Sequence, residues 1–209
     1  MQLLLRMPQE RTIEGRRDRV LLSLLYDSAA RVQELADIKV PDVRIQSPST
    51  VKLTGKGNKS RIVPLMKPMS DLLEQYLIEN RLITPHTGSY PLFFNRSKNK
   101  LTRAGIAYIV AKYANNTRLL SPELFPNKIS PHCFRHSKAM HLLQSGVNLV
   151  YIRDFLGHVD IQTTEVYARI DGEMKRKALE KSNHNMVLEK LPEWQSNTGL
   201  INWLKKLGK

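Results

Sequence analysis

The sequence predicts a mainly α-helical protein with a small three-stranded antiparallel sheet, an α+β fold. Apolar residues recur at helical spacing over most of the 209-residue chain. Three short extended runs, separated by turn residues, lie together between residues 43 and 64. Residues 130–167 are divided into short helices by capping residues and glycines. A hydrophobic content of 41% is sufficient for a core beneath these elements.

Two helices are expected before the sheet. The first begins near Arg17, and its apolar residues within 20–25 share one face. The second opens around Arg31, which lies on one face with Glu34, and it ends before Pro41. The alternative to a functional role for Arg31 is that it is a surface arginine paired with Glu34.

The predicted strands are residues 43–46, 50–54 and 60–64. Val51 and Leu53 alternate with polar neighbours, as expected of a half-buried strand. Turn residues 47–49 and 55–58 separate the three runs, which predicts antiparallel hairpins.

Further helices are expected after the sheet. Residues 68–80 form an amphipathic helix, and Thr102 caps another that runs to about Tyr113. Residues 114–129 contain two prolines and are expected to be a polar linker.

The stretch 130–167 should contain three helices. Ser130-Pro131 is a helix-start signal, and Gly146 stands where a left-handed C-terminal residue is needed. A shorter helix ends at Gly157, and Asp160 is the expected N-cap of a third helix that carries Tyr167.

The end of the chain is strongly basic and then amphipathic. A helix dense in Lys and Arg is expected at residues 171–181. Apolar residues recur at helical spacing in the tail from Trp194 to Lys209, which can pack on its own domain or on a neighbouring subunit.

The net charge of +14 is spread along the chain, which favours a basic folded surface over a disordered arm. Such a surface suits a polyanion, and nucleic acid is favoured over an anionic membrane. Cys133 is the single cysteine, so no internal disulfide is possible and a reducing cytoplasm is expected. No apolar run approaches the length of a membrane span.

An ordered set of motifs carries a family resemblance. His132 and Arg135 form H-x-x-R, residues 156–158 read L-G-H, and Tyr167 follows nine residues later. Together they resemble the active site of the tyrosine recombinase (phage integrase, Xer-type) family. Upstream, residues 29–35 are similar to its arginine box G-x-R-x-x-E-L, with alanine at position 29 where glycine is usual. Residues 54–65 match its lysine-bearing hairpin.

The resemblance implies a catalytic-domain fold and six catalytic residues: Arg31, Lys56, His132, Arg135, His158 and Tyr167. It implies a tyrosine nucleophile that forms a 3′-phosphotyrosyl intermediate, with two arginines gripping the phosphate oxygens. It also implies Lys56 as the acid for the leaving 5′-oxygen, His132 as acceptor of the tyrosine proton, and His158 as a hydrogen-bonding partner of a phosphate oxygen.

The resemblance further implies double-stranded DNA as partner and a homotetramer on paired sites, assembled through the C-terminal tail. Six basic residues are candidate DNA contacts: Lys59, Arg61, Arg96, Lys98, Lys100 and Arg103. A solvated basic face is the alternative for each of the last four. No nucleotide or other cofactor is expected.

No metal is expected either. Three helical histidines, His132, His136 and His141, lack the glutamate of a zinc helix, so the last two are interpreted as ordinary helix residues.

The catalytic domain is expected to span residues 1–185 and the tail 186–209, with the family's N-terminal core-binding domain absent. The leading hypothesis is a site-specific recombinase that works through a Holliday junction. The alternatives are a catalytically weak DNA-binding or regulatory protein, and a type IB topoisomerase-like enzyme that relaxes DNA.

Overall fold

The computed structural model describes residues 1–83, 89–126, 128–158, 161–182 and 199. The chain divides into two compact units, residues 1–168 and 169–209. All the predicted catalytic residues lie in the first unit. The predicted tail, 186–209, lies almost entirely outside the described residues, and its boundary at residue 185 stays a prediction.

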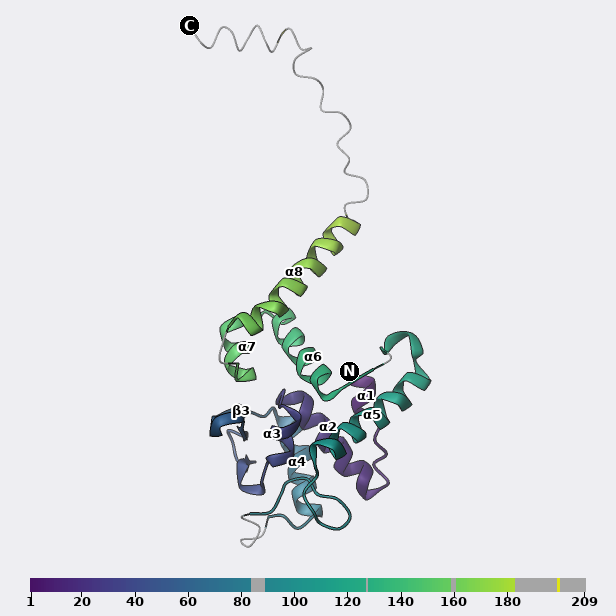
Figure 1. Cartoon of the computed structure of the whole chain (residues 1–209), viewed down its shortest axis with the longest axis vertical. Helices are drawn as coiled ribbons and strands as arrows, with labels where there is room; N and C mark the ends of the chain where they lie inside the picture. Colours follow the sequence, from purple (N-terminus) through teal and green to yellow (C-terminus); the bar gives the residue numbers. More distant parts are fainter. Residues whose placement is uncertain (84–88, 127, 159–160, 183–198, 200–209) are drawn as a thin grey trace. The chain divides into compact units, whose positions relative to one another are not determined.

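The first unit is mainly helical, as predicted. Figure 1 shows its helices, which are α1 (Gln2–Leu5), α2 (Ile13–Asp27), α3 (Val32–Asp37), α4 (Lys67–Glu79), α5 (Arg103–Leu120), α6 (Pro131–Gln144) and α7 (Leu149–Leu156). The helix α8 (Gln162–Ser182) begins in this unit. Short 3-10 helices are η1 (Val40–Asp42), η2 (Lys56–Asn58) and η4 (Pro122–Leu124).

The central helix α2 begins four residues earlier than the apolar pattern indicated. The side chain of Thr12 accepts a hydrogen bond of 3.0 Å from the backbone N–H of Gly15, which satisfies one of the free donors of the first turn. The apolar face of α2 packs against α4 and α6. Residues Leu21 to Leu25, Ser23 excepted, are fully buried, so this helix forms the middle of the core.

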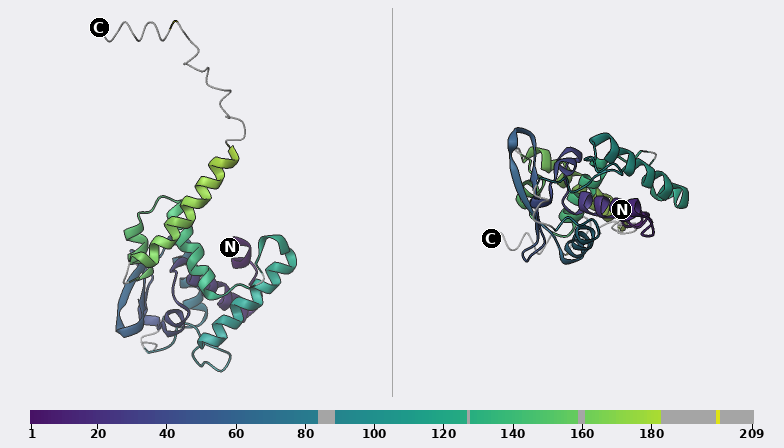
Figure 2. Two further views of the ribbon diagram at one scale, coloured as in Figure 1. Left: turned by 45° about the horizontal axis from the view of Figure 1, so that its top comes forward. Right: turned by 90° about the horizontal axis from the view of Figure 1, so that it is seen from below.

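The small sheet has the predicted antiparallel arrangement. Its strands are β1 (Val43–Arg44), β2 (Thr50–Thr54) and β3 (Ser60–Pro64), in the order β1-β2-β3. Val51 pairs with Val63, and Val51 and Leu53 are fully buried, which confirms the alternation along β2. The first strand is two residues shorter than predicted. The β2–β3 hairpin lies beside α7 (Figure 2).

The prediction of a polar linker over residues 114–129 was wrong for its first part. Helix α5 continues seven residues past Tyr113 to Leu120. Ala114 and Thr117 are buried on its inner face, and the Thr117 hydroxyl donates to the Tyr113 carbonyl at 2.7 Å. Helical hydrogen bonding therefore persists until Pro122, the first residue that cannot donate a backbone hydrogen bond.

The helix boundaries predicted at Ser130, Gly146 and Gly157 are confirmed. Helix α6 starts with Ser130 as N-cap, and Gly146 and Gly157 adopt positive φ of +82° and +64°. Asp160, the expected N-cap of the next helix, lies outside the described residues. The tyrosine-bearing helix and the basic segment expected at 171–181 are one helix, α8.

Two apolar clusters hold the first unit together. The larger joins α2, α3, α4, α5 and the sheet. The smaller contains five buried residues, which are Ala29, Ala139, Ile152, Leu156 and Tyr167. It packs Tyr167 against α6 and α7. None of the described helices has the length and apolar character needed to cross a membrane.

Candidate active site

Arg31 is positioned by a tight turn between α2 and α3. Ala29, at the position where glycine is usual, has a φ of +48° and is fully buried. A left-handed conformation costs a residue with a Cβ about 1–2 kcal/mol, so packing must hold this turn in place. Arg31 follows as the N-cap residue of α3.

Glu34 is a buried carboxylate that organises two arginines. Its Oε2 accepts a 2.8 Å hydrogen bond from the backbone N–H of Arg31, and its Oε1 accepts one of 2.8 Å from the Arg31 guanidinium. Burial alone would raise the pKa of Glu34. The hydrogen bonds and charges of Arg61 and Arg31 outweigh burial and lower the pKa to about 2, so the carboxylate stays ionised.

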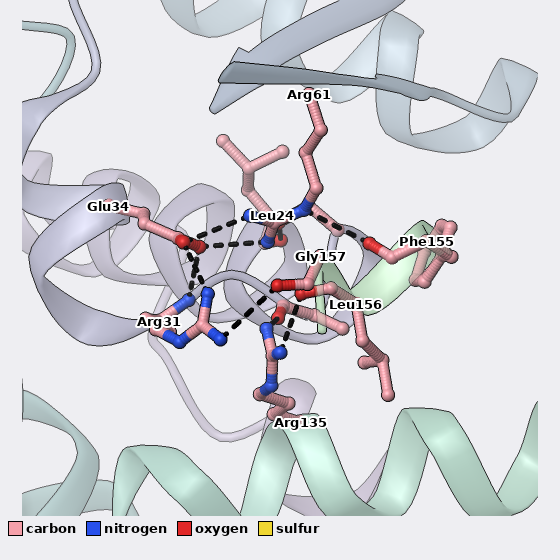
Figure 3. A network of polar contacts seen from close by, with 10 residues as sticks. Leu24, Arg31, Glu34, Arg61, Arg135, Phe155, Leu156 and Gly157 are labelled. Atoms are coloured by element: carbon pink, nitrogen blue, oxygen red, sulfur yellow. Dashed lines mark hydrogen bonds and ion pairs between the residues drawn. The ribbon is translucent and has the colours of Figure 1, made fainter. Parts of the chain in front are cut away.

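Arg61 connects the hairpin to both α3 and α7. Figure 3 shows its Nη1 and Nη2 donating to the two Glu34 oxygens at 2.9 and 2.8 Å, and its Nε donating to the Phe155 carbonyl at 3.0 Å. Its side chain is only 13% exposed. Sequence analysis did not find this bridge, because the three elements are far apart in the chain. Its role as a DNA contact stays a prediction.

Arg135 is anchored by two backbone carbonyls. It donates at 2.8 Å to Ala29 and at 2.6 Å to Leu156, and only 4% of the residue is exposed. Burial, with the nearby charges of Arg31 and Arg61, lowers the pKa of Arg135 to about 10, which still leaves it a cation at neutral pH.

The C-terminal end of α7 receives three different arginines. Arg61 donates to the carbonyl of residue 155 and Arg135 to that of residue 156; Arg31 donates to that of Gly157 at 3.5 Å (Figure 3). Carbonyls at a helix C-terminus lack intrahelical partners and carry partial negative charge. This helix end therefore gathers three guanidinium groups that would otherwise repel one another.

Lys56 lies at the tip of the hairpin, as predicted. The tip is formed by η2, where Gly57 has a φ of +73° and the N–H of Gly55 donates to the Lys59 carbonyl at 2.9 Å. Lys56 and Lys59 are both exposed.

A pocket of about 510 Å³ brings part of the site together. Its lining includes Arg31, Glu34, Lys56, Lys59, Arg61 and His158. Three of the six predicted catalytic residues thus face one cationic cavity, suited to a phosphate group. Arg135, His132 and Tyr167 are not among its lining residues.

His158 follows the left-handed Gly157 and lines this pocket. Its Nδ1 lies 2.9 Å from the hydroxyl of Thr164, a fully buried residue that sequence analysis did not single out. Burial, followed by the charges of Arg135, Arg31 and Arg61, lowers the pKa of His158 to about 4. The imidazole is therefore neutral at pH 7 and can donate or accept one hydrogen bond.

Tyr167 is buried, and its hydroxyl contacts an unexpected histidine. Only 5% of the residue is exposed, and the hydroxyl lies 2.7 Å from Nδ1 of His136. The side chain of His132, the predicted proton acceptor, makes no hydrogen bond with the described part of the chain, and both histidines are exposed. The one signal in the sequence was the i, i+4 spacing of these two histidines, which we interpreted only as a failed metal motif.

A second tyrosine close to the L-G-H turn, Tyr151, is 71% exposed on α7 and does not line the pocket.

The remaining basic candidates lie outside the pocket. Arg96 forms an ion pair with Glu14, and Lys100 forms one with Asp37. Lys98 lies 4.4 Å from the centroid of the Phe94 ring, and Arg103 is exposed at the start of α5. Their contact with DNA stays a prediction. Over the described ranges, no group of three or more His, Cys, Asp or Glu side chains could hold a metal ion.

Comparison with known proteins agrees with this geometry. The model of the phage integrase family matches residues 1–174. Tyrosine recombinase XerD of Listeria innocua is 38% identical over 158 residues, which are 75% of this chain and 51% of the relative. Tyrosine recombinase XerC of Syntrophus aciditrophicus is 35% identical over 173 residues, which are 80% of this chain and 54% of the relative. The chain thus spans about half the length of the curated relatives it matches.

Solved structures show the same fold. The XerH site-specific recombinase bound to palindromic difH substrate, in a post-cleavage complex, has a TM-score of 0.70 and 26% identity over 85% of this chain and 50% of its own. The XerA recombinase has a TM-score of 0.68, and the match covers 87% of this chain and 62% of XerA. Its 23% identity supports the fold alone. The matched motifs, the fold and the match over residues 1–174 place this chain in the phage integrase family of tyrosine recombinases.

Proposed function

We propose that this chain is the catalytic part of a site-specific DNA recombinase that cuts and rejoins DNA through Tyr167. The observation that carries the proposal is the cationic pocket in which Arg31, Lys56 and His158 meet. The pocket is assembled from the arginine box, the lysine hairpin and the L-G-H turn. Tyr167 lies on the helix that follows that turn.

The chemistry suits transfer of a phosphodiester to tyrosine. Arg31 lines the pocket, and Arg135 is hydrogen-bonded to Leu156, the residue before the lining residue Gly157, so their charges favour the negative charge that develops on the non-bridging oxygens. The Tyr167 oxygen attacks phosphorus and passes its proton to a nearby base, while the bond from phosphorus to the 5′-oxygen breaks. The departing 5′-oxygen takes a proton from Lys56. Energy is conserved in the phosphotyrosine, so rejoining needs no nucleotide.

The proposed partners are double-stranded DNA and further copies of the chain. The net charge of +14 supports a polyanion as partner. The XerH site-specific recombinase, which is similar to this chain, was solved bound to its palindromic difH substrate, and this supports DNA as the partner. Assembly as a homotetramer through the C-terminal tail stays a proposal, because most of the tail lies outside the described residues.

Covalent trapping tests the function. The full chain is incubated with nicked duplexes tiled across the DNA that flanks its gene, denatured, and examined for a band shifted by covalently attached DNA. The nick lets the short 5′-hydroxyl fragment diffuse away, so the adduct accumulates. We expect the wild-type chain to give this band and Tyr167→Phe to give none.

Tyr151→Phe is the matched control, because Tyr151 is an exposed tyrosine on the preceding helix, α7. It should trap DNA as the wild-type chain does. A band that survives Tyr167→Phe would refute the nucleophile. Salt-sensitive DNA binding without any adduct in the wild-type chain would refute the catalytic function and favour a binding protein.

A further inference from the structure

The contact between Tyr167 and His136 bears on how the nucleophile is activated. Tyr167 comes from the start of α8, and His136 comes from α6, immediately after the anchored Arg135. The phenol oxygen and Nδ1 are 2.7 Å apart, and the two ring centroids are 5.6 Å apart. This distance is within the range required for direct proton transfer.

The surroundings of Tyr167 make an acceptor necessary. Its ring belongs to the cluster with Ala29, Ala139, Ile152 and Leu156. Burial raises the pKa of the Tyr167 phenol, with the charge of Arg135 acting in the opposite direction. The phenol therefore holds its proton at neutral pH. Attack on phosphorus has to release that proton to a neighbouring group.

His132 and His136 are one turn apart on α6, about 6 Å along the helix axis at 1.5 Å per residue. Their side chains share one face of the helix, and in the structure the phenol oxygen is hydrogen-bonded to His136. Both histidines are exposed, and what separates them is that His136 is hydrogen-bonded to the hydroxyl while the side chain of His132, in the first turn, is not.

We propose that His136 is a catalytic residue, the group that accepts the phenolic proton of Tyr167 during strand cleavage. This inference rests on the proposed function. As the bond from the Tyr167 oxygen to phosphorus forms, the proton moves from that oxygen to Nδ1 of His136. The bond to the 5′-oxygen breaks, and that oxygen takes its proton from Lys56. In rejoining, Nδ1 returns the proton to the tyrosine oxygen.

The charges around His136 favour its neutral imidazole, the form that can accept a proton. The groups that act on it are His132 and Arg135 on its own helix, Tyr167 on α8, and His158 after α7. Burial first, then His132 and Arg135, lower the pKa of His136 below its ordinary value. The imidazole is thus neutral at pH 7 with a free electron pair on Nδ1. A bound phosphate adds negative charge, which favours the protonated form that results from the transfer.

The rate of adduct formation on a nicked duplex tests the role. General bases contribute about 10²–10⁴-fold, so His136→Ala should be at least about 100-fold slower than wild type. His136→Asn is the sharper variant, because its amide oxygen can still accept the hydrogen bond at the Nδ1 position but cannot take a proton. We expect it to be as slow as His136→Ala. Retained helical signal and melting temperature show that each variant folds.

The pH profile separates proton transfer from packing. Without its acceptor, the rate of His136→Ala should rise about tenfold per pH unit towards the pKa of the phenol. Wild type should be flat above neutral pH. His132→Ala should keep the flat profile, whatever its absolute rate.

A second readout needs no catalysis. Tyr167 donates its hydrogen bond to neutral His136, so Tyr167→Phe should raise the pKa of His136 measured by NMR titration.

Several outcomes would overturn the inference while the proposed function stands. They are wild-type rates in His136→Asn, faster adduct formation in His136→Ala, a flat profile in His136→Ala, or a steep profile in His132→Ala. An unchanged His136 titration in Tyr167→Phe would show that the contact is absent. If the wild-type chain itself forms no adduct, the proposed function fails and this inference fails with it.

Discussion

Arg61 and Glu34 form a two-bond ion pair in which Nη1 of Arg61 donates to Oε1 of Glu34 at 2.9 Å and Nη2 donates to Oε2 at 2.8 Å. The pair is nearly buried, since 13% of the Arg61 side chain and 2% of the Glu34 side chain are exposed. It joins the hairpin that carries Lys56 to the helix that begins at Arg31. The two predicted catalytic positions are therefore connected through this pair.

Removing the charge of Glu34 should destabilise the fold. In Glu34→Gln, two arginines lose their shared carboxylate, and breaking a buried pair costs about 3–5 kcal/mol. Urea unfolding at pH 7 measures the loss. Glu14→Gln is the control, because Glu14 pairs with the exposed Arg96 and should change stability little. Equal midpoints for the two variants would contradict the role given to Glu34.

Acid should remove the same contribution. The pKa of Glu34 is lowered from 4.5 to about 2 in the folded chain, so its ionisation stabilises the fold above pH 4.5. That contribution, about 3 kcal/mol at 1.36 kcal/mol per pKa unit, is lost as the pH falls from about 4.5 to about 2. Unfolding free energies of wild type and Glu34→Gln should therefore converge over this range. A constant difference between them would disprove the assignment.

The strained turn at Ala29 predicts opposite effects at two neighbouring alanines. Ala29→Gly relieves a φ of +48°, and we expect a gain in stability of up to about 1 kcal/mol. Ala30 is equally buried but has no positive φ, so Ala30→Gly should lose about 1 kcal/mol. Thermal unfolding of both variants measures the contrast. A loss of stability in both would mean that the turn is not strained.

Replacing Arg61 by lysine should loosen the hairpin while preserving charge. Lysine cannot form the two-bond contact with Glu34 and also reach the Phe155 carbonyl. We expect the Gly55 amide, which donates to the Lys59 carbonyl at the hairpin tip, to exchange its hydrogen at least about tenfold faster.

Adduct formation should also slow in Arg61→Lys, because Lys56 is less well positioned. Lys59→Gln is the control for hairpin exchange, since it removes an exposed charge from the same tip. If the Gly55 amide hydrogen exchanges at the same rate in the two variants, Arg61 does not position the hairpin.

Much of the fold was predictable because its signals are local. The alternation of Val51 and Leu53, the Ser130 cap and the positive φ of Gly146 and Gly157 each depend on a few adjacent residues. The end of α5 was missed because residues 114–120 look polar in the sequence. Only packing reveals that Ala114 and Thr117 face the core.

By itself, the sequence determined the types of the candidate site residues, their order along the chain and the short helices and hairpin on which they lie. Those features follow from spacing within single elements, where neighbours three or four residues apart share a face. Only the tertiary structure decided which groups touch. Arg135 donates to Ala29 across 106 residues, and Tyr167 meets His136 across 31. Such contacts depend on how helices pack, and a side chain's partner across that distance is set by the shape of the whole core.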